Sequence, residues 1–285
     1  MSIKLSLTKL IPDKIYLQLL YYKHFKKFID FKNPKTFNEK LQWLKLYDRK
    51  PEYTTMVDKY AVKKYVADII GEEYIIPTLG VWDSPEDIDF DALPNQFVLK
   101  WNHDSGSIVI CKDKNQLNRE EAVMKLQKGK KYSGFWYGRE WPYKNVKPCI
   151  IAEQYMEDAE NGELRDYKFF CFGGVAKMMF VATERQKEGE EVKFDFFDMD
   201  FKHLDVKQGH PNASISPKKP ERFDEMRHLA EKLSQNIPQL RVDFYEVNGH
   251  VYFGELTFSH FSGVVPFEPE EWDEILGRWI ILAEK

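Results

Sequence analysis

The stretch from Leu240 to Gly263, LRVDFYEVNGHVYFGELTFSHFSG, constrains the fold of this chain more than any other. Two apolar-rich runs flank an Asn-Gly pair, which is a strong short-range signal for a β-hairpin. Arg241 and Asp243 lie on the first run, and Glu255 and Thr257 lie on the second. Because successive strand residues point to opposite faces, the turn decides whether these four polar side chains share one face.

Two turns are compatible with the sequence. A two-residue Asn-Gly turn would pair Asp243 with Gly254 and send Glu255 to the opposite face. A three-residue loop, Asn248 to His250, with Gly249 left-handed and a bulge, would pair Asp243 with Glu255 and Arg241 with Thr257. We expect the second, and since two opposed carboxylates repel unless a cation lies between them, we interpret Asp243 and Glu255 as a magnesium-binding pair. The alternative is a solvent-facing hairpin with scattered charges.

The composition indicates an ordinary globular protein of 285 residues, with 31% charged and 43% apolar residues and a net charge of -4. The length suits one large domain or two small ones, and no whole-chain basicity suggests a nucleic-acid partner. No apolar run is long enough to cross a bilayer, and the start lacks the apolar core of a secretory signal, so we expect a cytoplasmic protein. Three scattered cysteines suggest neither a disulfide framework nor a zinc site.

Residues 1–30 carry six lysines and two aspartates, with apolar residues at helical spacing, among them Leu17, Tyr21 and Phe25. This pattern predicts an amphipathic basic helix. We favour a helix that packs on the main body with its lysines in water. The alternative is peripheral contact of residues 1–30 with an anionic membrane surface or a membrane-bound partner.

Lys100 lies in an otherwise apolar strand, 97–101, which is followed by the loop NHDSG and a second strand at 107–111. A buried lysine is costly unless it is paired, so we expect Lys100 to point at an anion or a carboxylate. With the glycine-containing loop, the pattern is typical of a nucleotide clamp, although an edge hairpin with an outward-reaching lysine is common. Further along, Glu153 ends a buried strand, and Asp166 and Lys168 share one face of a predicted hairpin.

Other segments are assigned more coarsely. We predict helices at 36–47, 54–70, 119–127, 221–236 and near the C-terminus, and a strand over 192–204. Thr36 or Asn38 is the expected N-cap of the first of these helices. The 221–236 helix is amphipathic and is expected to turn its apolar residues inward: Phe223, Met226, Leu229, Ala230 and Leu233. The aromatic segment KYSGFWYGREWPYKNVKP, residues 131–148, is predicted to be a loop: a lid, a sugar-stacking surface, or simply a loop packed on the body.

Taken in order, the polar residues above resemble the ATP-grasp superfamily of carboxylate-activating ligases. The strings VLKWNHDSG, EQYM, RDYKFFCFGG and GELTFSHFSG look like its TupA-like branch, over roughly residues 33–280. The resemblance implies an α+β fold of two subdomains that clamp ATP between them. We therefore expect a helical N-terminal segment at 1–57, a small subdomain with the phosphate loop at 58–150 and a large subdomain with the metal site at 151–285.

The resemblance also implies roles for individual residues. Arg241, Lys100 and Lys168 would be catalytic, and Asp243, Glu255 and Thr257 would bind Mg²⁺. The phosphates of ATP would contact Lys100 and either Lys59 or Lys63, and the loop residues His103, Ser105, Gly106 and Ser107 would also bind the nucleotide. The residues on the adenine side would be Glu153, Gln154, Tyr155 and Met156. Asp166 and Lys168 would contact ATP as well. Ser259, His260 and Ser262 follow the second metal strand and either contact this site or are ordinary polar loop residues.

Two departures from the superfamily are visible. Thr257 stands where an asparagine is usual, which leaves open whether one or two metal ions bind. Residues 1–57 lack the strand-helix alternation of the usual first domain.

The implied reaction is ATP-dependent activation of a carboxylate, most concretely a uronic acid or related sugar acid, for amide formation with an amine in cell-surface polysaccharide or capsule biosynthesis. The alternatives are a kinase acting on a glycan, a non-catalytic glycan-binding module, and a glycosyltransferase. We rank the last low because Asp198-Met199-Asp200 is expected within an apolar strand.

Overall fold

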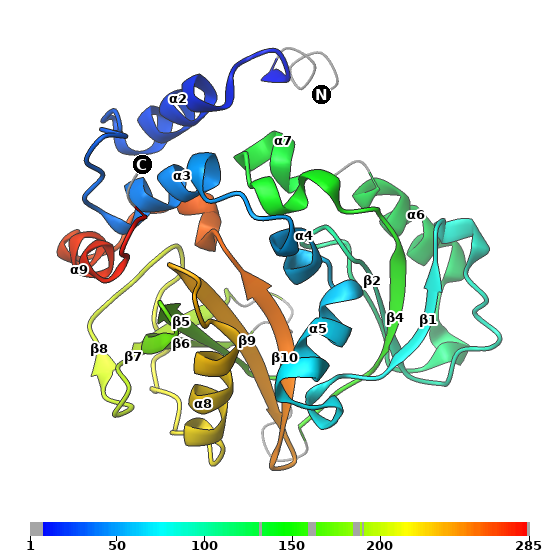
Figure 1. Ribbon diagram of the computed structural model, residues 1–285. Helices are drawn as coiled ribbons and strands as arrows, with labels where there is room; N and C mark the ends of the chain where they lie inside the picture. Colours follow the sequence, from blue (N-terminus) through cyan, green and yellow to red (C-terminus); the bar gives the residue numbers. More distant parts are fainter. Residues whose placement is uncertain (1–7, 131–132, 159–163, 185–188, 190, 284–285) are drawn as a thin grey trace. The chain divides into compact units, whose positions relative to one another are not determined.

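The computed structural model describes residues 8–130, 133–158, 164–184, 189 and 191–283 (Figure 1). The chain forms two compact units. Unit 1 comprises Met1–Arg49 and Asp158–Lys285, and unit 2 comprises Lys50–Glu157. Each unit combines helices with its own antiparallel sheet, which agrees with the predicted α+β class.

The boundaries between the units differ from those expected. The predicted 1–57 segment does not stand alone, because its helix α3 (Phe37–Tyr47) packs against the C-terminal helix α9 (Glu271–Trp279) within unit 1. The boundary near 150 moves to Glu157 because strand β4 (Ile150–Gln154) pairs with two strands of unit 2.

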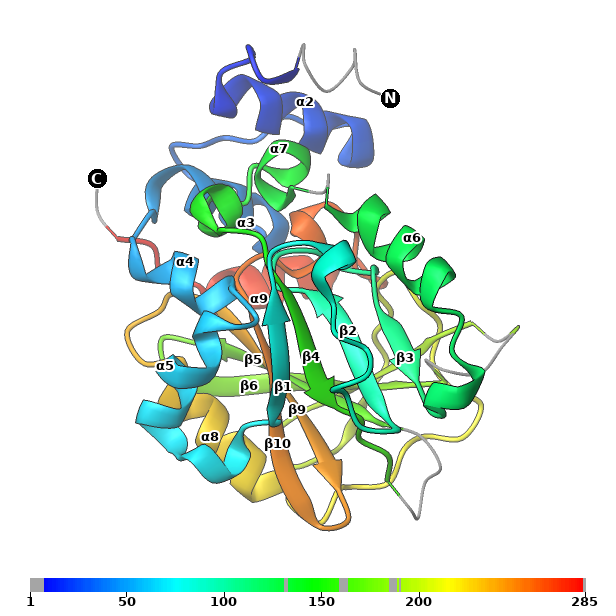
Figure 2. The same ribbon diagram turned by 90° about the vertical axis from the view of Figure 1, so that its right-hand side faces the viewer.

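Unit 2 has a four-stranded sheet in the order β1-β4-β2-β3, which Figure 2 shows side by side. The other strands are β1 (Thr78–Trp82), β2 (Phe97–Trp101) and β3 (Val109–Cys111). Alternate residues of β2 pack into a core with helix α6 (Arg119–Gly129). Because those core residues are the odd-numbered ones, Lys100 lies on the opposite face.

Two predictions for unit 2 are wrong in detail. The helix expected at 54–70 is two helices, α4 (Glu52–Val57) and α5 (Ala61–Ile70). They are separated at Asp58, which has an extended backbone and whose carboxylate accepts hydrogen bonds from the N–H groups of Tyr60 and Ala61. The aromatic segment predicted as a loop contains α7 (Gly134–Gly138) and a 3₁₀ helix (Trp141–Asn145). Its residues 131 and 132 lie outside the described part of the chain.

Unit 1 has a six-stranded sheet in the order β10-β9-β5-β6-β7-β8. Its strands are β5 (Asp166–Phe172), β6 (Val175–Thr183), β7 (Lys193–Phe197), β8 (His203–Leu204), β9 (Leu240–Val247) and β10 (His250–Thr257). The strand predicted over 192–204 is therefore two strands. Asp198 begins the turn between them, and its carboxylate accepts hydrogen bonds from the N–H groups of Asp200 and Lys202.

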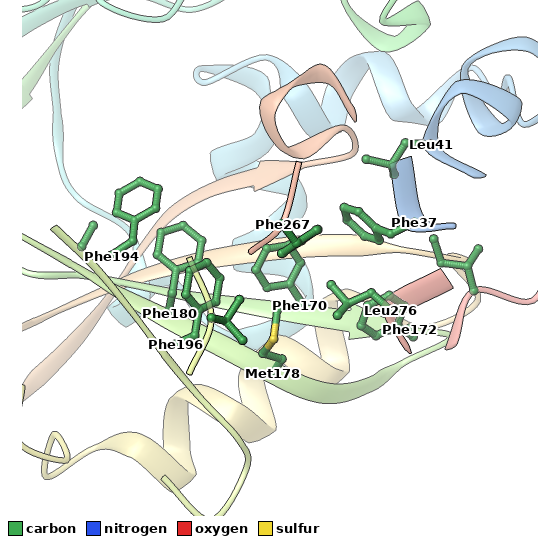
Figure 3. Close-up of a cluster of buried hydrophobic side chains, with 13 residues drawn as sticks. Phe37, Leu41, Phe170, Phe172, Met178, Phe180, Phe194, Phe196, Phe267 and Leu276 are labelled. Carbon is green, nitrogen blue, oxygen red and sulfur yellow. The ribbon is translucent and has the colours of Figure 1, made fainter. Parts of the chain in front are cut away.

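The two faces of this sheet are covered differently. Helix α8 (Phe223–Leu233) contacts β5, β6 and β9, and its predicted inward residues Phe223, Met226, Leu229, Ala230 and Leu233 are all buried. Phe169 meets α8 through Phe223, so Phe170 points to the other face, where it packs with Phe37 of α3 and Leu276 of α9 (Figure 3). Thr36, one of the two residues predicted as the N-cap of α3, forms a capping box with Glu39.

The N-terminal part of unit 1 also contains helix α2 (Asp13–Phe25), which is shorter than the predicted helix over 1–30, and residues 1–7 are outside the described range. Within the described residues no helix is both long and apolar enough to span a membrane.

The hairpin β9–β10 has the predicted pairing but not the predicted turn. Val247 pairs with His250, so the turn is the two-residue one, with φ of 51° at Asn248 and 74° at Gly249. Nevertheless Asp243 pairs with Glu255 and Arg241 with Thr257. The extra residue that makes this possible is Gly254, a bulge within β10 rather than in the turn.

Candidate active site

Six of the predicted site residues lie on one face of the unit 1 sheet. Strand register pairs Lys168 of β5 with Asp243 of β9, and Asp243 with Glu255 of β10. Alternation places the remaining members, Asp166, Arg241 and Thr257, on the same face. The prediction that these side chains share one face, made from the alternation of strand residues, is therefore confirmed.

Asp243 is the centre of this cluster. Arg241 donates to both of its oxygens, from Nε to Oδ1 at 2.7 Å and from Nη2 to Oδ2 at 2.7 Å. Lys168 contacts the same Oδ2 and also lies 2.7 Å from Oδ2 of Asp166. Nη2 of Arg241 reaches Oε1 of Glu255 at 2.8 Å. Arg241 is thus a cation between the two opposed carboxylates, and three carboxylates face two basic side chains.

Burial sets the electrostatics of the cluster. Burial raises the pKa of Asp243 against the opposing pull of Arg241 and Lys168, so this carboxylate depends on those two cations to stay ionised. Burial lowers the pKa of Arg241, but Asp243 and Glu255 more than compensate and raise it. The guanidinium is therefore a permanent, fixed charge.

His260 is a further partner of Arg241. Its Nδ1 lies 2.6 Å from Nη1 of Arg241, and since arginine can only donate, Nδ1 accepts and the proton of the neutral ring is on Nε2. Burial, followed by the charges of Arg241 and Lys168, lowers the pKa of His260 well below 6.5. The ring stands edge-on to Phe170, with the centroids 5.1 Å apart. Of the three loop residues named from the sequence, His260 has a direct contact with the cluster.

The loop after β10 is held by helix α3, which the sequence did not reveal. Phe261 and Ser262 have φ of 46° and 53°, in the left-handed region that non-glycine residues seldom adopt. The ammonium of Lys45 donates to the carbonyl of Ser262 at 2.7 Å and to its hydroxyl at 2.9 Å, and Gln42 donates to the carbonyls of Ser262 and Gly263. A lysine in the apolar run LQWLKLY was the available signal, because a buried lysine needs acceptors.

The donor set suits magnesium bound together with phosphates. Among the described residues no group of three or more histidine, cysteine or acidic side chains is placed to hold a metal ion. Asp243 and Glu255 nevertheless supply two carboxylates, and the Thr257 hydroxyl stands on the same face. Mg²⁺ commonly takes one or two carboxylates and completes its shell with water and substrate phosphates. These residues therefore suit Mg²⁺ bound together with phosphates better than a metal ion held by protein ligands alone.

Unit 2 contains a second charged cluster. Glu153 lies 2.8 Å from Nζ of Lys63 through Oε1 and 2.5 Å from Nζ of Lys100 through Oε2. Burial alone would raise the pKa of Glu153, but Lys100 and Lys63 together hold it below its usual value. The expectation that Lys100 points at a carboxylate is confirmed. Two lysines against one acid leave a positive charge, which suits a phosphate group.

The other residues predicted to bind the nucleotide are close to Lys63, Lys100 or Glu153 in the sequence. Nζ of Lys59 donates to the carbonyl of Asp104 at 2.8 Å, so Lys59 anchors the loop of His103, Ser105, Gly106 and Ser107. Gly106 has φ of 115°, and a side chain there would meet only open space, so glycine is required by the backbone rather than by crowding. At the end of β4, Gln154 is exposed; after it, Tyr155 lies under the ammonium of Lys112, and Met156 is buried. The binding roles of these residues remain predictions.

Comparison with known proteins assigns the fold and the family. Residues 39–281 match the family model described as TupA-like ATPgrasp, and the chain belongs to this TupA-like ATP-grasp family. The predicted family and ATP-grasp fold class are therefore confirmed. No curated protein matches the sequence.

Solved structures give distant matches. One is D-alanine–D-alanine ligase from Bacillus anthracis complexed with ATP, with 15% identity, a TM-score of 0.42 and coverage of 72% of this chain and 54% of that one. The same ligase from Helicobacter pylori has 16% identity, a TM-score of 0.42 and coverage of 80% and 63%. The ATP-grasp ligase PsnB complexed with its minimal precursor has 10% identity, a TM-score of 0.44 and coverage of 77% and 59%. The chain thus spans less than two thirds of the length of these proteins.

Proposed function

We propose that this protein is an ATP- and magnesium-dependent ligase that activates a carboxylate as an acyl phosphate for attack by an amine. The observation that carries the proposal is the cluster of Arg241, Lys168, Asp243 and Glu255 on one sheet face, in a chain of the TupA-like ATP-grasp family. Phosphoryl transfer needs positioned charge more than covalent help from the protein, and this cluster supplies both signs of charge in fixed positions.

Each residue of the cluster has a task in this proposal. Asp243 and Glu255 would hold Mg²⁺, which when bound neutralises phosphate charge, and Thr257 is the third candidate ligand. Four N–H groups of Arg241 are used by Asp243, Glu255 and His260, which leaves one N–H of Nη1 with no partner among the described residues. That N–H would donate to the transferred phosphoryl group and the acyl intermediate.

In unit 2, the Lys63–Glu153–Lys100 cluster would bind the nucleotide. The positive charge of the two lysines favours the phosphates, and the loop from His103 to Ser107 supplies backbone N–H groups. Both oxygens of Glu153 are already paired with lysines, so an adenine amine would share this carboxylate with them.

For the acceptor we propose a uronic acid or related sugar acid, joined to an amine in cell-surface polysaccharide assembly. This choice follows the family resemblance. A ligase that consumes ATP in this role would work in the cytoplasm.

Calorimetric titration tests the nucleotide site before any acceptor is known. ADP or a non-hydrolysable ATP analogue is titrated with and without magnesium into the wild type, Glu255→Gln and Glu246→Gln. Glu246 is the matched control, because it lies on the same hairpin but is three residues from Asp243 and therefore on the opposite face. We expect magnesium-dependent binding that weakens in Glu255→Gln alone. No binding by the wild type under either condition would refute the proposed function.

Phosphate release in a screen of uronic acids with amines then separates the remaining functions. A ligase requires both the acid and the amine. Phosphorylated glycan formed without any amine would establish the kinase instead, and glycan binding without nucleotide binding would establish a binding module.

A further inference from the structure

Helix α2 carries apolar side chains on two opposite faces. Leu17 and Tyr21 point inward and are buried in a small core with Ile29, Phe31 and Trp43. Ile15, Leu19 and Tyr22 follow one another at spacings of four and three residues, which places them on one outward stripe, and 53%, 53% and 44% of their surfaces are exposed. A helix that only covers a core needs the first stripe and not the second.

Exposed apolar side chains also lie in the segments on either side of the helix. Leu10, before α2, is 82% exposed, and Phe28, after it, is 64% exposed and stacks on Tyr22 with ring centroids 4.7 Å apart. Large apolar side chains that are scattered singly over a surface are normal, but a contiguous group of them marks an interaction site.

Lysines lie at the C-terminal end of this apolar stripe. Lys23 lies four residues after Leu19 and therefore on the same side of the helix, and Lys26 ends the helix next to it. Residues 9–32 contain six lysines and two aspartates, whereas the whole chain has a net charge of -4. Two acidic side chains near the helix are already paired: Asp13 of α2 with Arg49, and Glu270 with Lys27. The surface is thus both apolar and locally basic.

We propose that this surface, Leu10, Ile15, Leu19, Tyr22 and Phe28 with the nearby lysines, docks on an anionic lipid membrane. The apolar side chains would enter the headgroup region while the lysines meet lipid phosphates. A second copy of the chain fits less well, because two lysine-rich surfaces would repel each other. One helix of about 20 Å gives weak, reversible and salt-sensitive attachment, and it lies on the membrane without spanning it.

Vesicle flotation of the full-length protein tests this proposal independently of the ligase activity. The vesicles contain phosphatidylcholine alone or phosphatidylcholine with phosphatidylglycerol. The variants are Ile15→Glu/Leu19→Glu, Lys23→Glu/Lys26→Glu, and the control Ile215→Glu, which changes an isoleucine that is 84% exposed in a loop elsewhere in unit 1. All of these positions are exposed, so unchanged thermal unfolding would confirm that the variants are folded.

We expect the wild type and Ile215→Glu to float only with the anionic vesicles and to be released by high salt. Each double variant should lower the bound fraction about tenfold or more. Absence of wild-type binding would overturn the proposal, as would binding that survives in Ile15→Glu/Leu19→Glu, because attachment would then not use the apolar stripe. Dimerisation in light scattering that disappears in Ile15→Glu/Leu19→Glu, without vesicle binding, would assign the surface to a second copy.

Discussion

Replacing His260 with phenylalanine tests how Arg241 is held. Phenylalanine keeps an aromatic ring against Phe170 but removes the Nδ1 acceptor, so the Nη1 group of Arg241 loses its partner. A hydrogen bond to a charged group contributes about 1.5–3 kcal/mol, and a buried donor without a partner costs a similar amount. We expect His260→Phe to lower the free energy of unfolding at pH 7.5 by about this much.

The stability difference between the wild type and His260→Phe should also depend on pH. The folded pKa of His260 is lowered well below 6.5, so the folded ring stays neutral where the unfolded ring takes up a proton. Below pH 6.5 the unfolded state therefore binds more protons, and stability falls as the pH falls. At pH 5.5, one unit below the unfolded value, the wild type should have lost about 1.4 kcal/mol of the advantage over His260→Phe that it has at pH 7.5.

Denaturant unfolding at the two pH values measures both effects. His260→Asn supplies an amide oxygen as an acceptor and should recover part of the stability at pH 7.5, but it should lack the pH dependence. His228→Phe, on an exposed position of α8, should change the stability by less than about 0.5 kcal/mol. A wild-type advantage over His260→Phe that stays constant from pH 7.5 to 5.5, or no advantage at all, would refute the neutral acceptor role of His260.

Three other changes test separate parts of the structure. Glu153→Gln leaves two largely buried lysines without their carboxylate and should lower the free energy of unfolding by about 3–5 kcal/mol, whereas Asp68→Asn, which breaks an exposed pair, should cost no more than about 0.5 kcal/mol. Lys45→Met removes the donor that holds the left-handed loop after β10; it should cost about 1–3 kcal/mol and increase cleavage of that loop in limited proteolysis. Gly254→Ala would place a Cβ 3.0 Å from the carbonyl oxygen of Asp243, so it should cost about 1–3 kcal/mol and weaken magnesium-dependent nucleotide binding in calorimetry. Unchanged stability in any of the three would show that the corresponding contact is not formed in solution.

Local sequence patterns predicted the features of the fold that depend only on the spacing of residues within one helix or strand. The inward residues of α8 follow from a period of 3.6 residues, and all five are buried. Thr36 is one of the two caps expected for α3, and in the structure it caps the helix together with Glu39. In the same way, alternation along β5 placed Asp166 and Lys168 on one face, because the period of a strand needs no knowledge of distant residues.

Contacts between distant segments were not predictable in this way. Lys45 and Ser262 are far apart in the chain, and nothing near either residue shows that they meet. The helix expected over 54–70 failed for a related reason: the apolar spacing continues through Asp58, but its side chain offers the backbone a cap that competes with an unbroken helix. The pairing of β4 with β1 and β2 was likewise not visible in local patterns, because it joins segments that are far apart in the chain.

The hairpin of β9 and β10 shows how the correct strand pairing can follow from a wrong turn. The sequence requires one extra residue between Asp243 and Glu255 if both are to share a face, but it does not say where that residue lies. Asn248 and Gly249 both adopt positive φ and form the two-residue turn that suits the twist of a hairpin, so the extra residue is placed elsewhere. Gly254 accepts it because a residue without a side chain tolerates the approach of the Asp243 carbonyl. The bulge lies beside Glu255, so the irregularity in the strand directly adjoins one of the two carboxylates that would hold the metal ion.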